Sequence, residues 1–271
     1  MSQKLIDYYD ITLVSDDLSD MDEFICGTEY EIEDIKSIKL PGHSDTMYPT
    51  QLNLSDSNAW WVGKIGLVHD GSLRNHGVEF ITRPVTFNEA IKLFSTLHDG
   101  LKLGPEPYTV RTSTHVHVNM CNMTLDQCKH MMLLYALLEP VFFAAVKPER
   151  QFNIHCVPLN YTMLPSFYKS PFQDIVKSWS KYSALNLMPL RTQGTMEFRH
   201  LHGTGDIAVY QNWLTLLNEL WTFAFMNPPS TLEKMLRSGA TPKEICGNVL
   251  PSASFGGVDF STSLIDVKLA F

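Results

Sequence analysis

The sequence lacks the features that mark several large classes of protein. Only 18% of its 271 residues are charged, and 21 lysines and arginines against 29 aspartates and glutamates give a formal net charge of −8. This acidic balance provides no electrostatic affinity for nucleic acid or an anionic membrane surface, although a local basic funnel for a phosphate ligand is compatible with it. A hydrophobic content of 44% is too high for a disordered chain. We therefore expect a folded protein that binds neither nucleic acid nor membrane.

Targeting signals and long apolar runs are missing as well. Residues 1–10 contain no apolar segment of the kind that signal peptides carry. The longest apolar stretch, residues 131–146, is interrupted by Glu139 and Pro140 and is too short to span a bilayer. The 5 cysteines show no C-x-x-C spacing, which favours reduced and mostly buried thiols over disulfides or a zinc site. These observations predict a cytoplasmic protein.

Several common catalytic signatures are also absent. The sequence contains no glycine-rich P-loop and no G-x-G-x-x-G motif, so a P-loop nucleotidase or a Rossmann dinucleotide site is disfavoured. It contains no G-x-S-x-G nucleophile motif and no recognisable Cys/His signature. There is no internal repeat, and the length fits one domain.

Helix starts are indicated by capping boxes, in which a Ser or Thr side chain and a Glu or Gln three residues later satisfy backbone N–H groups reciprocally. Such pairs occur at Thr86/Glu89, Thr124/Gln127, Ser230/Glu233 and Thr241/Glu244. A further helix is predicted over 206–226 by apolar residues at spacings of three and four. We expect a single catalytic domain over 1–271, with its core at 22–226 and a helical appendage and tail at 227–271.

Four segments between these helices alternate with the period of a β-strand, namely Gly27–Glu33, Gly77–Arg83, Thr114–Met120 and Thr195–Arg199. Each is apolar on one side and carries acids, imidazoles or arginines on the other. Pairs of strands separated by long helices favour an α+β fold. We therefore expect a mostly antiparallel sheet with helices on one face and the active site on the other.

The polar sides of these strands suggest a metal site. Glu29 and Glu31 share one side of a strand about 7 Å apart, where a divalent cation would relieve their repulsion. The alternative for this pair alone is a water-exposed acidic edge. The further candidate ligands are Asp70, Glu79, His115 and Glu197. Carboxylates with one imidazole suit Mg²⁺ or Mn²⁺ better than Zn²⁺.

Basic residues close to these acids suggest phosphate chemistry. Arg199 shares a strand side with Glu197, and a guanidinium beside metal-binding carboxylates can neutralise transferring phosphoryl oxygens. Arg191 and Lys181 lie in the preceding segment. For Arg83, a salt bridge with the neighbouring Glu79 is the favoured alternative.

Histidines occur in two H-x-H pairs of different character. His115 and His117 share a strand side with Asn119, which favours a site. His200 and His202 have the opposite parity to Glu197 and Arg199, which favours partly buried or turn histidines.

Taken together, the motifs resemble the carboxylate-amine ligase family with a glutamine-synthetase-like catalytic fold. The segments that carry the resemblance are GTEYE, the hairpin from DGSL to GVEFITRP, THVHV, and KYSALNL followed by GTMEFRHLHGT. They occur in the family's order between Gly27 and about Trp213. The chain is most similar to short amidoligase-like members found in phages and bacteria, and more distantly to glutamate-cysteine ligase.

The resemblance implies an ATP-dependent carbon–nitrogen ligase that forms an amide or peptide bond through an acyl phosphate, with ATP and Mg²⁺, or Mn²⁺, as cofactors. It implies as partners a small-molecule or peptide carboxylate and an amine, in the host cytoplasm if the protein is phage-encoded. The implied metal ligands are Glu29, Glu31, Asp70, Glu79, His115 and Glu197. The implied catalytic residues are Arg199, Glu197 and Glu79, the implied nucleotide contacts are His117 and Arg199, and the implied substrate contacts are Arg83 and Asn186. From their places in the sequence we add Arg191 and Lys181 as nucleotide contacts and Asn119 as a substrate contact.

The sequence departs from the family pattern at a few positions. Glu33 adds a third acid to the first strand, and His200 and His202 replace an apolar residue and a glycine-bordered turn. Two other functions stay open, a metal-dependent hydrolase and a catalytically degenerate nucleotide- or protein-binding module of the same fold. Aromatic residues of two loops are candidates to line a substrate pocket, namely Trp60, Trp61, Tyr161, Phe167 and Tyr168.

Overall fold

The computed structural model describes residues 3–12, 22–39, 41, 46–48, 64–68, 70–159 and 170–261. The chain forms two compact units. Unit 1 comprises residues 1–24, 118–200 and 213–271, and unit 2 comprises residues 25–117 and 201–212. The expectation of a single catalytic domain stays a prediction.

The fold is α+β with mostly antiparallel strands, as the sequence predicts. In chain order the elements are α1 (Leu5–Tyr9), β1 (Ile25–Ile32), β2 (Ile35–Ile38), β3 (Ile65–Val68), β4 (Val78–Thr82), β5 (Val85–Thr86), α2 (Phe87–Asp99), β6 (Leu101–Leu103), β7 (Ser113–Asn119), α3 (Leu125–Ala144), the 3₁₀ helix η4 (Pro148–Phe152), α4 (Phe172–Ser178), β8 (Leu185–Asn186), the 3₁₀ helix η7 (Met188–Arg191), β9 (Thr195–His202), α5 (Ile207–Met226), α6 (Ser230–Arg237) and α7 (Pro242–Val249).

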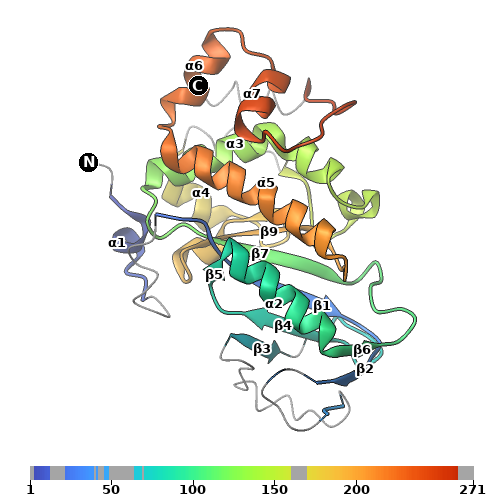
Figure 1. Ribbon diagram of the computed structural model, residues 1–271. Coiled ribbons are helices and arrows are strands. Elements are labelled where there is room, and N and C mark those ends of the chain that lie inside the picture. The colour runs from blue at the N-terminus through green and yellow to red at the C-terminus, as the bar shows by residue number, and fades with distance from the viewer. Residues whose placement is uncertain are drawn as a thin grey trace. The chain divides into compact units, whose positions relative to one another are not determined.

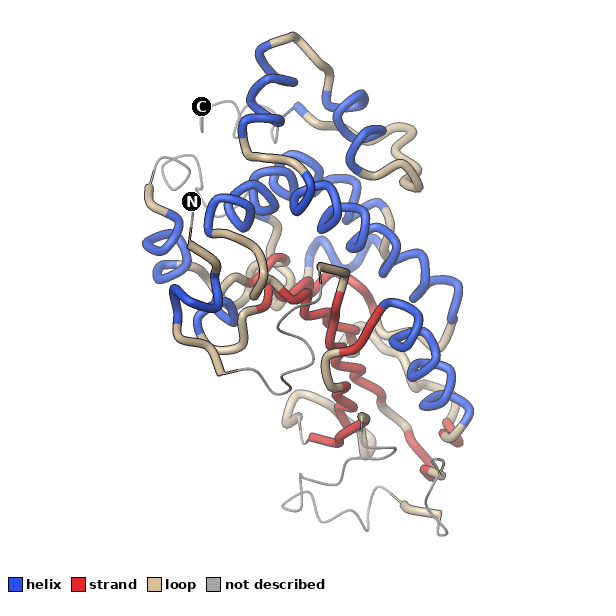
Figure 2. The backbone as a smooth tube through the Cα atoms, turned by 60° about the vertical axis from the view of Figure 1, so that its left-hand side comes forward, coloured by secondary structure: helices blue, strands red, loops and turns tan. Residues whose placement is uncertain are grey.

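In unit 2 the strands follow the order β3-β4-β1-β7, with β5 also paired to β1. The β1–β4, β3–β4 and β1–β5 pairs are antiparallel. A separate two-stranded sheet joins β2 and β6, also antiparallel. Helix α2 lies along one face of the larger group of strands, in contact with β1 and β5 (Figures 1 and 2).

The alternation of apolar and polar side chains along β1 places its apolar side against α2. Tyr30 of β1 is 1% exposed, and its ring lies 5.7 Å from that of Phe94 on α2. The Tyr30 hydroxyl donates to the Tyr210 hydroxyl over 2.9 Å, so the polar end of this buried ring is satisfied. Because successive side chains of a strand point to opposite faces, Glu29 and Glu31 lie on the face of β1 that α2 leaves open. This agrees with the expectation of helices on one face and polar site residues on the other.

Strands β7 and β9 each contribute residues to both units. In unit 2 the N–H of Gly203, just after β9, donates to the carbonyl of Thr112, just before β7, over 3.0 Å. In unit 1 the N–H of Met120 donates to the carbonyl of Gly194, just before β9, over 2.8 Å. The two strands therefore run antiparallel.

In unit 1 the second part of α5 packs antiparallel to α3. The ring of Phe142 lies 5.8 Å from that of Trp213, and Gln127, at the other end of α3, donates through Nε2 to the Phe225 carbonyl over 2.7 Å. Helix α3 is apolar nearly all round, which suits a helix buried on several sides. Pro140 lies inside it without ending it.

His200 of β9 is fully buried in unit 1, as its strand parity suggested. Its Nε2 lies 2.7 Å from the Tyr135 hydroxyl, and its ring lies 4.8 Å from that of Phe143. Burial, with a smaller effect of the nearby Arg150 charge, holds the pKa of His200 well below its ordinary value. This histidine therefore belongs to the core.

Two of the four predicted capping boxes form. Thr124/Gln127 caps α3 and Thr241/Glu244 caps α7 reciprocally. Thr86 precedes α2 without a side-chain cap, and Glu89 pairs with Lys64 instead. Helix α6 begins at Ser230 itself, so that the hydroxyl lies inside the helix rather than before it. Glu233 forms an ion pair with Arg237 of the same helix, so an ion pair engages the glutamate of the predicted box at both sites.

All five cysteines are free and buried, as the odd number and the spacing suggested. Among the helices in the described ranges, none combines the length and the apolar character needed to cross a bilayer.

Candidate functional site

The acids of β1 and β4 are brought together by strand register in unit 2. Glu31 is paired directly with Glu79 across the antiparallel ladder. Residues directly opposite each other in such a ladder carry their side chains on the same face, with Cβ atoms about 5 Å apart. Glu31 is buried at 6% exposure, whereas Glu79 is half-buried. Two like charges are thus placed face to face.

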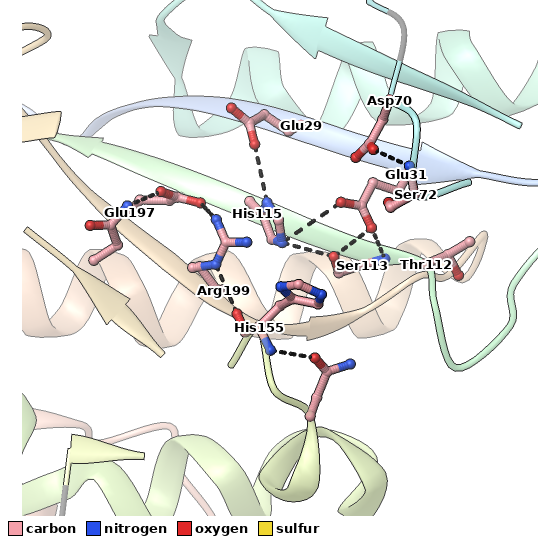
Figure 3. Close-up of polar contacts among 12 residues, drawn as sticks. Glu29, Glu31, Asp70, Ser72, Thr112, Ser113, His115, His155, Glu197 and Arg199 are labelled. Atoms are coloured by element: carbon pink, nitrogen blue, oxygen red, sulfur yellow. Dashed lines mark hydrogen bonds and ion pairs between the residues drawn. The ribbon is translucent and has the colours of Figure 1, made fainter. Parts of the chain in front are cut away.

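Asp70 joins this pair from the turn that connects β3 to β4. Val68, the last residue of β3, is paired with Glu79, and Asp70 follows two residues later. The carboxylate of Asp70 accepts a 2.7 Å hydrogen bond from the Ser72 N–H, which fixes it at the start of the turn (Figure 3). Glu31, Asp70 and Glu79 each offer a carboxylate oxygen within 4.8 Å of the others. We call these three residues the acidic trio.

Glu29 lies between two histidines of β7. Its carboxylate accepts from His115 Nδ1 over 3.1 Å (Figure 3). It also accepts from His117 Nε2 over 3.1 Å. Burial opposes ionisation of this carboxyl, but the two histidine hydrogen bonds outweigh it and hold the pKa of Glu29 below its ordinary value. Glu29 therefore faces these histidines as a carboxylate.

Ser113, which the sequence analysis did not single out, connects the two groups of acids. Its N–H and its hydroxyl both donate to Glu31 Oε2, over 2.7 and 2.6 Å. The same hydroxyl lies 2.8 Å from His115 Nε2. Ser113 is the first residue of β7, two positions before His115, and therefore shares its side of the strand. Extending the predicted alternation by one residue would have found it.

In unit 1 a second polar group centres on β9. Arg199 forms an ion pair with Glu197, and its Nε donates to the His155 carbonyl over 2.9 Å (Figure 3). Asn186 of β8, paired with Glu197 in the ladder, donates through Nδ2 to the other carboxylate oxygen over 2.6 Å. The side chains of Arg199 and Glu197 are only 17% and 6% exposed. The guanidinium is thus held in one orientation from two sides.

Asn119 and Arg191 are engaged locally in unit 1. Asn119 ends β7, and its side-chain oxygen accepts from the Cys121 N–H over 3.1 Å. Arg191 ends η7 and is exposed. The predicted substrate and nucleotide contacts of these residues stay predictions.

Two further predicted basic residues are exposed. The ammonium of Lys181, in unit 1, lies 5.0 Å from the Tyr182 ring centre. Arg83, in unit 2, follows the end of β4, and its N–H donates to the Lys64 carbonyl over 2.9 Å. Their roles also stay predictions.

The aromatic residues expected to line a pocket lie outside the described residues. They are Trp60, Trp61, Tyr161, Phe167 and Tyr168.

The two groups differ in the chemistry they offer. The acidic trio is an all-oxygen set of the kind that binds hard divalent cations. The group on β9, formed by Arg199, Glu197 and Asn186, presents a guanidinium next to a carboxylate. A guanidinium can bind an oxyanion such as a phosphoryl group. The described residues therefore present an oxygen-only acidic set in unit 2 and a guanidinium–carboxylate pair in unit 1. The metal, nucleotide and substrate roles predicted for them stay predictions.

A comparison with protein families gives a match over most of the chain. The model of a family described as "Putative amidoligase enzyme" matches residues 21–221, which contain β1, β4, β7 and β9 and every predicted site residue. A search of curated proteins gives no match.

Proposed function

Because the chain belongs to the amidoligase family, whose name describes a ligase, we propose that it is an ATP-dependent carboxylate-amine ligase. Its substrates are a small-molecule or peptide carboxylate and an amine, and its product is an amide or peptide bond.

The observation that carries this proposal is the acidic trio. Glu31, Asp70 and Glu79 come within 4.8 Å of one another through strand register and a turn, and a cation among them would offset their repulsion. Their oxygen-only chemistry fits Mg²⁺ or Mn²⁺. Ser113, which donates to Glu31, also contacts His115, and His115 contacts Glu29. When bound, Mg²⁺ supplies positive charge that neutralises the phosphate oxygens of ATP.

The reaction needs no side-chain nucleophile. An oxygen of the substrate carboxylate attacks the γ-phosphorus of ATP, the bond to the ADP oxygen breaks, and an acyl phosphate and ADP form. The amine nitrogen then attacks the acyl carbon and loses a proton, and inorganic phosphate leaves. The protein binds and orients the reactants and stabilises charge.

Within this reaction Arg199 is assigned to the oxygens of the transferred phosphoryl group. Glu197 and the His155 carbonyl hold the guanidinium in place, so little reorganisation is needed when a phosphate arrives. We assign His117, Arg191 and Lys181 to the nucleotide, and Arg83, Asn119 and Asn186 to the substrates.

The test is ADP release by the full chain, supplied with ATP, Mg²⁺ and pools of carboxylates and amines. We expect release that needs Mg²⁺ and both substrates, and that falls at least about 100-fold in Arg199→Ala. A thermal-shift titration with ATP should show a rise in the unfolding midpoint that requires Mg²⁺.

Other outcomes would contradict the proposal. Hydrolysis that depends on metal but not on ATP would identify a metal-dependent hydrolase. Binding of ATP without turnover of any pool would identify a degenerate binding module.

A further inference from the structure

A buried carboxylate outside the acidic trio connects three segments of unit 2. Glu33 follows β1 directly and is 1% exposed. Its Oε1 accepts from the Arg74 N–H over 2.7 Å, and its Oε2 accepts from the Thr109 hydroxyl over 2.9 Å. Its own N–H donates to the Pro107 carbonyl over 2.9 Å. One side chain thus ties the end of β1 to the turn at 70–77 and to the segment at 107–112.

The turn at 70–77 is the one that carries Asp70, and it fits closely around Glu33. Asn75 and His76 both have positive φ, at 50° and 59°, which makes the turn tight. A Cβ added at Gly77 would lie 3.1 Å from Glu33 Cγ and 2.7 Å from Leu73 Cβ. The turn therefore packs closely against the Glu33 side chain and leaves no room for a Cβ at position 77.

The other oxygen of Glu33 acts on the entry to β7. Thr109, which donates to Glu33, also accepts from the Arg111 N–H over 3.1 Å, and Arg111 in turn donates to the Ser72 carbonyl over 3.1 Å. This segment leads directly to Ser113, whose N–H and hydroxyl hold Glu31. Loss of the Glu33 carboxylate would loosen Asp70 and the partner of Glu31 together.

We propose that Glu33 is a positioning residue that holds the Asp70 turn and the entry to β7 so that the acidic trio binds its divalent cation. Glu33 is not a member of the oxygen cluster that Glu31, Asp70 and Glu79 form, and each of its own oxygens accepts a hydrogen bond from another segment. The inference depends on the proposed function for the presence of the cation.

The test measures binding of Mn²⁺ alone to the full chain, from the electron paramagnetic resonance signal of free Mn²⁺. Glu33→Ala should weaken Mn²⁺ affinity by about 10- to 100-fold, as loss of supporting groups around metal ligands does. Glu33→Gln should stay within about threefold of wild type, because its amide oxygen accepts from Arg74 and its NH₂ group donates to the Thr109 oxygen. Thr109→Val should give a smaller loss than Glu33→Ala. Glu106→Ala, which removes an exposed carboxylate from the same segment, is the matched control and should bind as wild type does.

The outcomes separate positioning from ligation. Glu33→Gln binding as weakly as Glu31→Gln would show that Glu33 is a ligand, and wild-type affinity in Glu33→Ala would show that its contacts do not matter; either overturns the inference. If Glu33→Ala does not fold, wild-type affinity in Thr109→Val overturns it instead. Absence of Mn²⁺ binding in wild type would overturn both this inference and the proposed metal site, whereas failure of the variants alone leaves the proposed function intact.

Discussion

Removing one charge from the acidic trio should stabilise the protein without metal and abolish its response to metal. Asp70→Asn is the cleanest change, because the Asn oxygen can still accept from the Ser72 N–H that fixes the turn. Asp70 faces two carboxylates, each with an oxygen within 4.8 Å. At this distance, even with the dielectric constant of water, each pair of charges repels by about 0.9 kcal/mol.

The expected stabilisation is therefore about 1 to 2 kcal/mol, which corresponds to a rise of roughly 2 to 8 °C in the unfolding midpoint. The assay is thermal unfolding in EDTA at low ionic strength, repeated with 0.5 M KCl, where screening should shrink the difference. Added Mg²⁺ should raise the midpoint of wild type and leave that of Asp70→Asn nearly unchanged. Glu106→Gln is the control for loss of a charge elsewhere in unit 2. An Asp70→Asn midpoint in EDTA that is equal to or below wild type would refute the idea that the trio is self-repulsive.

Three further predictions concern individual residues. The hydrogen bonds that lower the pKa of Glu29 stabilise the folded protein at pH values above the pKa of this carboxyl in the unfolded chain, which is near 4.3, and this stabilisation is lost as the pH falls below it. Glu29→Gln should therefore lower the unfolding midpoint at pH 7, and the difference from wild type should fade at acid pH. Gly194 has φ +67°, and a Cβ there would lie 2.2 Å from the Cys121 sulfur. Gly194→Ala should therefore lower the free energy of unfolding, measured in urea, by at least about 1 to 3 kcal/mol, and equal stability would contradict this. Gly247→Ala is the control, because Gly247 lies on the open surface of α7, and it should raise the free energy of unfolding by about 0.5 to 1 kcal/mol. Arg199→Lys, which cannot keep both contacts of the guanidinium, should lower kcat for ADP release by roughly 100-fold, and a kcat near wild type would remove Arg199 from the proposed phosphate contact.

Local sequence patterns predicted the four strands that carry most of the candidate site residues, β1, β4, β7 and β9, and the helices α2, α3, α5, α6 and α7. Alternation along β1 predicted that Tyr30 is buried and that Glu31 lies on the other face, because a strand's geometry alone imposes this parity. The boxes at Thr124 and Thr241 form as predicted, whereas those at Thr86 and Ser230 do not, although their partners are equally close in sequence. The set of motifs likewise indicated the family that the family model matches.

Contacts between distant segments were decided only by the tertiary structure. The pairing of Glu31 with Glu79 depends on the register of two strands, and the place of Asp70 depends on the turn between them. Glu33 looked like a third acid of the same strand, yet it lies beyond the end of β1 and binds backbone and hydroxyl donors. A sequence shows which side of a strand each residue occupies, because that is set by neighbouring peptide units. Strand register and the turns between strands decide which acids come into contact and which of them positions the others. Both depend on contacts between residues that are tens of positions apart in the sequence.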